Sequence, residues 1–189
     1  MKTFKKFFSI VVMIAIIATM ACPQAQAKKK KAQKKQAIEQ LLAQGNEMYV
    51  AGQYEEAVAI FKQIDKKGDV RGTNNLAICY AEGNGVAQDY AKAFKLYEKA
   101  AKKGYVDAEE ALGTMYKNGF GCKKDYKKAI EWLEKAAAKG SSDAMYLIAS
   151  CYYYGGNGIN KDILKAKEWM QRSADLGNET AISNLPKLQ

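Results

Sequence analysis

A set of motifs that recurs at a spacing of 36 residues constrains this chain more than any other feature of its sequence. The segment from Leu76 to Gly104 reads LAICYAEGNGVAQDYAKAFKLYEKAAKKG, and the segment from Leu112 to Gly140 reads LGTMYKNGFGCKKDYKKAIEWLEKAAAKG. A third copy runs from Ile148 to Gly177 and contains one inserted residue. A period in the thirties is typical of solenoids in which each repeat is a pair of helices.

Residues that match between the copies predict where the two helices of each repeat, helix A and helix B, begin and end. Gly83 and Gly85 lie where the chain must turn back sharply after helix A, because glycine reaches positive φ without steric cost. An aspartate after this turn is expected to cap helix B, in the three copies Asp89, Asp125 and Asp162. A polar residue after the next glycine is expected to cap the following helix A: Asp107, Asp143 and Asn178. Glu110, three residues after Asp107, would complete a capping box.

Four short motifs connect these positions: Leu-Gly-x-x-Tyr, Gly-x-Gly, Asp-x-x-Lys-Ala and Lys-Ala-Ala-x-x-Gly. Together they resemble the Sel-one-like repeat, a relative of the tetratricopeptide repeat, over roughly residues 70–177. The resemblance implies an all-α fold, a right-handed α-solenoid of antiparallel helix pairs. It also implies that the A helices line a concave face that binds protein or peptide partners.

The predicted organisation has seven parts. Gly45, Gly52, Tyr54, Ala57 and Phe61 occur at tetratricopeptide spacing, which indicates an N-terminal repeat over 37–68. Three Sel-one-like repeats are expected at 70–104, 106–140 and 142–177, followed by a C-terminal cap helix and tail at 178–189. A lysine-rich lead-in occupies 28–36, and residues 1–27 are interpreted as a signal peptide.

The leader has the three parts of an export signal. Lysines at positions 2, 5 and 6 precede the apolar run from Phe7 to Ala21, and Ala25-Gln26-Ala27 has the form of a cleavage site. Cleavage after Ala27 predicts a periplasmic or secreted protein. Two alternatives remain, a lipoprotein modified at Cys22 and a chain that keeps its leader as a membrane anchor.

The net charge of +10 lies almost entirely at the N-terminus. Without the lysines at 2, 5, 6, 28–31, 34 and 35, the chain holds 21 basic and 20 acidic residues. Since binding to phosphates needs clustered cations, we expect no nucleic-acid partner.

The chain contains no histidine, which excludes serine–histidine and cysteine–histidine catalytic pairs. We therefore expect neither enzymatic activity nor a cofactor. Some cysteine-rich members of the resembled family are linked to β-lactams, so a cell-envelope hydrolase or glycan-binding protein is the alternative function. Here Ala101 and Ala137 stand where those members have paired cysteines. Cys79 and Cys151 are expected in the core, with Cys79 a free thiol and the redox state of Cys151 left open. The pair Glu109–Glu110 is expected to be a solvated face.

The remaining candidate site is the surface formed by outward positions of the A helices. By resemblance these positions are Asn74, Ile78, Glu110, Thr114, Lys117, Tyr146, Ser150 and Tyr153. Tyr146 and Tyr153 are seven residues apart, two helical turns, and so share a stripe beside the motif residue Tyr152, which we expect in the core. Clustered tyrosines are enriched at interfaces, so this stripe is either a partner-binding site or an incidental half-buried surface.

Overall fold

The computed structural model describes the backbone of residues 2–188 and the side chains of residues 24–188. The chain divides into two compact units, Met1–Leu41 and Leu42–Gln189. Helix α1 (Lys2–Val50) begins in the first unit and ends in the second. In the first unit, all side chains from 24 to 37 are exposed, including the six lysines of the lead-in. Most of the expected signal peptide and the Cys22 side chain lie outside the residues whose side chains are described.

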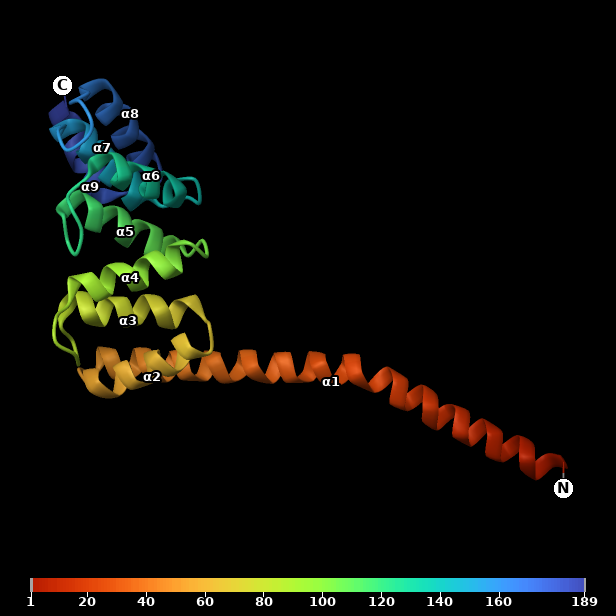
Figure 1. Ribbon diagram of the computed structural model, residues 1–189. Coiled ribbons are helices and arrows are strands. Elements are labelled where there is room, and N and C mark those ends of the chain that lie inside the picture. The colour runs from red at the N-terminus through yellow and green to blue at the C-terminus, as the bar shows by residue number, and fades with distance from the viewer. Residues whose placement is uncertain (1, 189) are drawn as a thin grey trace. The chain divides into compact units, whose positions relative to one another are not determined.

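The second unit is a succession of short helices, each lying against the next. After the last turns of α1 come α2 (Tyr54–Lys66), α3 (Val70–Glu82), α4 (Tyr90–Ala101), α5 (Val106–Asn118) and α6 (Tyr126–Ala137). Helices α7 (Ser142–Tyr154), α8 (Ile163–Asp175) and α9 (Glu179–Asn184) follow, and a 3₁₀ turn, η1 (Leu185–Leu188), closes the stack. Figure 1 shows α2 to α8 stacked in chain order. The predicted all-α solenoid of helix pairs is confirmed, with A helices α3, α5 and α7 and B helices α4, α6 and α8.

The glycine turn after each A helix is required by close packing between repeats. Gly85 and Gly121 have φ values of 69° and 67°, and a Cβ on either would collide with a backbone carbonyl, that of Tyr54 or Tyr90. Each turn therefore lies directly on the first residue of the preceding B helix. In the last repeat the inserted residue changes this contact, because the carbonyl of Asn157 accepts a hydrogen bond from the Tyr126 amide (2.8 Å).

The helix caps confirm one expectation and correct another. Asp89, Asp125 and Asp162 each accept a hydrogen bond from the amide three residues on, at 2.9–3.0 Å. Asn178 caps α9 in the same way (2.9 Å). Asp107 and Asp143, however, do not cap α5 and α7, so no capping box forms at Asp107. The capping residues are Tyr105 and Ser141, which follow the glycine directly. The two aspartates lie in the first turn, where the helix dipole favours negative charge.

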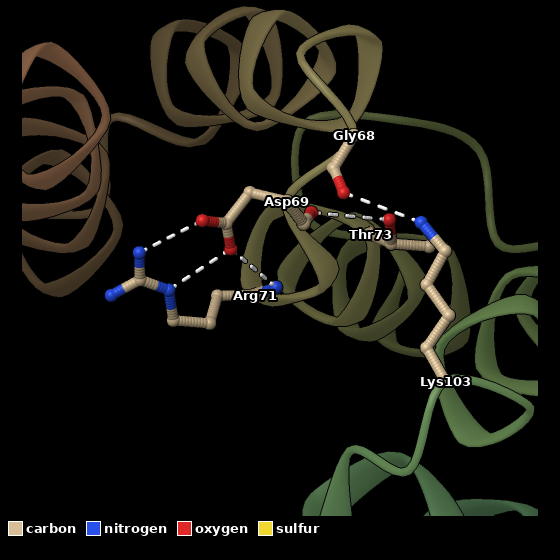
Figure 2. Close-up of polar contacts among 5 residues, drawn as sticks. All are labelled: Gly68, Asp69, Arg71, Thr73 and Lys103. Carbon is tan, nitrogen blue, oxygen red and sulfur yellow. Dashed lines mark hydrogen bonds and ion pairs between the residues drawn. The ribbon is translucent and has the colours of Figure 1, made fainter. Parts of the chain in front are cut away.

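A lysine just after each of the helices α4 and α6 donates a hydrogen bond to the glycine carbonyl one repeat earlier. Figure 2 shows Lys103 Nζ donating to the carbonyl oxygen of Gly68 (3.3 Å), beside the Asp69 carboxylate, which accepts from Arg71. Lys139 donates in the same way to Gly104 (3.0 Å) and also pairs with Glu109 (2.7 Å). Glu109 is only 2% exposed, so the expected solvated face is wrong at this position. Lys139, just after helix α6 of the same repeat, supplies the counter-charge that makes the burial of Glu109 possible.

No helix in the described part of the chain combines the length and the apolar character that a membrane span requires.

Candidate functional site

The eight predicted surface positions differ widely in exposure. Asn74 is 4% exposed and its Oδ1 has no hydrogen-bond partner, and Ser150 is 9% exposed and donates to the Leu147 carbonyl (2.8 Å). The expectation that Asn74 faces outward is therefore wrong, and Ser150 exposes only a small part of its surface. Ile78 and Lys117 are half-buried and line neither of the two hollows described below. Glu110 and Thr114 line one hollow, and Tyr146, Ser150 and Tyr153 line the other.

The first hollow, which we call the α5 groove, has a volume of about 440 Å³. Its floor is α5, through Glu110, Thr114 and Met115, and its walls come from the neighbouring helices α3, α4 and α7. The groove thus lies across three successive A helices.

One wall of the α5 groove is aromatic. The rings of Tyr90, at the start of α4, and Phe120, in the turn after α5, are stacked with centroids 4.8 Å apart. Phe120 is 42% exposed, whereas Tyr97 behind it is buried, which raises the pKa of its hydroxyl. Sequence reasoning missed Tyr90 and Phe120. The available signal was a bulky aromatic residue between the two turn glycines, Gly119 and Gly121.

The opposite part of the α5 groove is acidic. Asp107 and Glu110 come from α5 and Asp143 from α7. Glu110 is half-buried and accepts a hydrogen bond from Ser141 Oγ (2.7 Å). Burial raises the pKa of the Glu110 carboxyl, and the negative charges of Asp143 and Asp107 raise it further. Within residues 24–188, neither lysine nor arginine forms an ion pair with any of these three carboxylates.

The second hollow, the C-terminal hollow, has a volume of about 220 Å³ and collects the predicted tyrosines. Tyr153 is 37% exposed, and its ring meets that of Tyr154 edge-on at 5.1 Å. Tyr146 also packs against a small buried cluster formed by α7, α8 and the C-terminal cap, so part of its ring has a structural role. Tyr152, which we expected in the core, is half-buried. Lys165 Nζ lies over its ring, 5.3 Å from the ring centroid.

The model of the Sel1 repeat matches three consecutive segments of the chain, residues 70–105, 106–141 and 142–178. The chain belongs to the Sel1 repeat family. Sel1 repeats generally serve as protein-interaction scaffolds. No curated protein sequence matches this chain.

Solved structures of Sel1 repeat proteins have the same fold. A Sel1 repeat protein from Oxalobacter formigenes is 32% identical with a TM-score of 0.73, over 79% of this chain and 62% of that one. The protective antigen c5321 of uropathogenic Escherichia coli, which displays an SLR fold, is 30% identical with a TM-score of 0.75, over 84% of this chain and 35% of that one. The chain therefore spans less than two thirds of either relative. Cysteine-rich protein B of Helicobacter pylori, 23% identical with a TM-score of 0.51 over 69% of this chain and 93% of that one, shares the fold.

Among the described residues, Cys79, Cys122 and Cys151 are free thiols, which confirms the prediction for Cys79. Cys79 and Cys151 are fully buried, and burial raises the pKa of each thiol to about 11. Cys122 is half-buried, and its thiol lies 3.5 Å from the Met115 carbonyl. Ala101 and Ala137 are buried between helices. Among the described residues, no three cysteine, aspartate or glutamate side chains are grouped so that they could hold a metal ion.

Proposed function

We propose that this protein is an exported scaffold that holds a protein or peptide partner on the surface of its A helices. The protein would act in the periplasm or outside the cell. In the two alternatives it stays attached to a membrane, through a lipid on Cys22 or through an uncleaved N-terminal anchor. The supporting observation is that two preformed hollows adjoin along one helix. Asp143 of the α5 groove and Tyr146, Ser150 and Tyr153 of the C-terminal hollow lie three, seven and ten residues apart on α7, on one helical face.

Such a surface suits a partner that lies across several repeats. Its exposed aromatic rings, Phe120, Tyr153 and Tyr154, offer large contact areas that lose little side-chain entropy when a partner covers them. The hollows are formed by packed helices rather than by long loops, so binding requires little rearrangement of the backbone. The proposed partner site therefore consists of the α5 groove together with the C-terminal hollow.

The test is partner capture by a Tyr153→Ala variant of the full chain. Because Tyr153 is partly exposed, its loss should change the free energy of unfolding by less than about 1 kcal/mol while weakening capture about tenfold or more. Leu164→Ala is the matched control, since it removes an apolar side chain that is 82% exposed on helix α8, away from both hollows. Equal capture by wild type and both variants would reject the C-terminal hollow as a binding site.

Tyr116→Ala serves as the folding control. Tyr116 packs edge-on against Phe94 at 5.2 Å and contributes to the cores on both sides of α5. Its truncation should lower the melting temperature through a cavity, at a cost of about 3 kcal/mol. If Tyr153→Ala loses as much stability as Tyr116→Ala, the loss of capture reflects unfolding and the proposed surface is not supported.

A further inference from the structure

Glu110 of the α5 groove differs from the other buried or half-buried carboxylates of the described chain. Asp65 pairs with Lys99 (2.6 Å), Asp69 with Arg71 (2.8 Å) and Glu109 with Lys139 (2.7 Å). Glu110, the neighbour of Glu109, is half-buried, yet among the described residues it accepts a hydrogen bond from the neutral Ser141 hydroxyl and forms no ion pair. Asp107 and Asp143 are exposed, line the same end of the groove, and pair with no described lysine or arginine. This end of the groove therefore has three carboxylates and no cation paired with them.

These carboxylates share the α5 groove with an apolar wall. The acidic end is formed by the first turns of α5 and α7, and the stacked Tyr90 and Phe120 rings form the other side. A groove of about 440 Å³ accommodates a few side chains of an extended peptide. A short peptide segment with a cationic side chain close to an apolar or aromatic one would complement both the acidic end and the aromatic wall of the groove.

We propose that the α5 groove binds a cationic segment of the protein partner, with a lysine or arginine side chain against Asp107, Glu110 and Asp143. An apolar or aromatic side chain of the same segment lies on Tyr90 and Phe120. The inference rests on the proposed function, because it assigns the chemistry of the partner at part of the same surface. Bound cationic charge would relieve the repulsion among the three carboxylates and would stabilise the ionised form of the half-buried Glu110, whose pKa is raised by burial and by the charges of Asp143 and Asp107.

The experiment measures fluorescence anisotropy with three labelled octapeptides and the full chain, produced with its own leader. The peptides share two phenylalanines and differ at two positions, which hold lysine, glutamine or glutamate. The lysine peptide should bind with a Kd at least about tenfold below that of the glutamine peptide, and the glutamate peptide should bind most weakly. Raising NaCl from about 50 to about 500 mM should reduce the advantage of lysine.

Two double variants that change the net charge of the protein by the same amount test whether the preference for the lysine peptide depends on the groove. Asp107→Asn with Asp143→Asn keeps an acceptor oxygen for Tyr105 and Asn178, which contact these carboxylates in the folded chain, but removes two charges from the groove. It should abolish most of the lysine advantage. Glu131→Gln with Glu134→Gln removes two charges from the exposed surface of α6 and should leave the advantage intact. Circular dichroism checks that both variants are folded.

The outcomes separate this inference from the proposed function. If lysine and glutamine peptides bind equally and Phe120→Ala weakens both, the groove binds peptides but the inferred cation preference is wrong. Equal loss of the lysine advantage in both double variants would also overturn it, since the effect would then be one of net charge. If none of the peptides binds while partner capture still depends on Tyr153, the inference fails and the proposed scaffold function stands.

Discussion

The middle repeat, α5 and α6, and the last repeat, α7 and α8, have the same kind of buried motif residues but differ at the positions between them. Leu112 and Ile148 are fully buried at equivalent positions, as are Ala108 and Ala144. At the positions between them, Glu109 and Glu110 of the middle repeat are replaced by Met145 and Tyr146. The repeat motif thus determines how the helices stack, while the residues between motif positions determine the chemistry of each repeat.

The largest expected difference in stability between these two repeats concerns alanine substitutions in the glycine turn. Gly121 and its equivalent Gly158 both have positive φ, but a Cβ on Gly121 would collide with the Tyr90 carbonyl, whereas one on Gly158 would be 3.5 Å from Lys127 Cβ, an ordinary contact. Gly121→Ala should lower the free energy of unfolding by about 3–5 kcal/mol, and Gly158→Ala by about 1–2 kcal/mol, the cost of left-handed backbone alone. Chemical denaturation measures both.

A third variant separates backbone strain from collision. Gly140→Ala places a Cβ at positive φ with no atom within 4 Å. It should resemble Gly158→Ala. If Gly121→Ala is no more destabilising than these two, the turn of the middle repeat does not need the close approach to α4 that the structure describes.

The second prediction concerns the buried Glu109 and its partner. Lys139→Met removes the cation and leaves the carboxylate buried, so it should lower the free energy of unfolding by about 2–3 kcal/mol, somewhat less than for a fully buried pair because Lys139 is 39% exposed. Adding Glu109→Met imitates Met145 of the last repeat and should restore most of the loss. Lys103→Met removes a hydrogen bond to the Gly68 carbonyl and a positive charge near Asp65 and Asp69, but these carboxylates keep their partners Lys99 and Arg71, so it should cost less than about 1 kcal/mol.

If the double variant Glu109→Met with Lys139→Met is as unstable as Lys139→Met alone, positions 109 and 145 are not equivalent. That result would mean that a buried methionine at position 109 does not fit between α5 and α6, and that the last repeat tolerates Met145 for reasons of its own packing.

The stacking of helices could be predicted because it depends on residues that recur at fixed spacing. The turn glycines, the Asp89-type caps and the buried Cys79 all follow from the motif. The surface could not be predicted equally well, because exposure depends on side chains that are distant in sequence. The pair Glu109–Glu110 has the pattern of a solvated face, but Lys139, which compensates Glu109, is 30 residues away in sequence. The burial of Asn74 has no signal in the repeat motif, and Phe120 lies in a turn that the motif defines only by its glycines.

The smallest predicted effect tests the acidic end of the α5 groove. A carboxyl whose pKa is higher in the folded than in the unfolded chain makes folding take up protons, so its unfavourable contribution is largest at neutral pH and disappears as the pH falls below its ordinary pKa. Glu110→Gln removes this contribution and keeps an acceptor oxygen for Ser141. We therefore expect it to raise the free energy of unfolding at about pH 7 by up to about 1 kcal/mol, and to leave no gain at about pH 4.

The matched control for this prediction is Glu134→Gln on the exposed surface of α6, which should have little effect at either pH. The two variants differ in what surrounds the carboxylate: Asp107 and Asp143 beside Glu110, and open solvent around Glu134. A gain in stability for Glu110→Gln together with weaker binding of the lysine peptide would mean that the middle repeat gives up stability to keep an uncompensated charge for a partner. Loss of stability at pH 7 would mean instead that the Ser141 hydrogen bond outweighs the repulsion, and that Glu110 stabilises the start of α7 in the free protein.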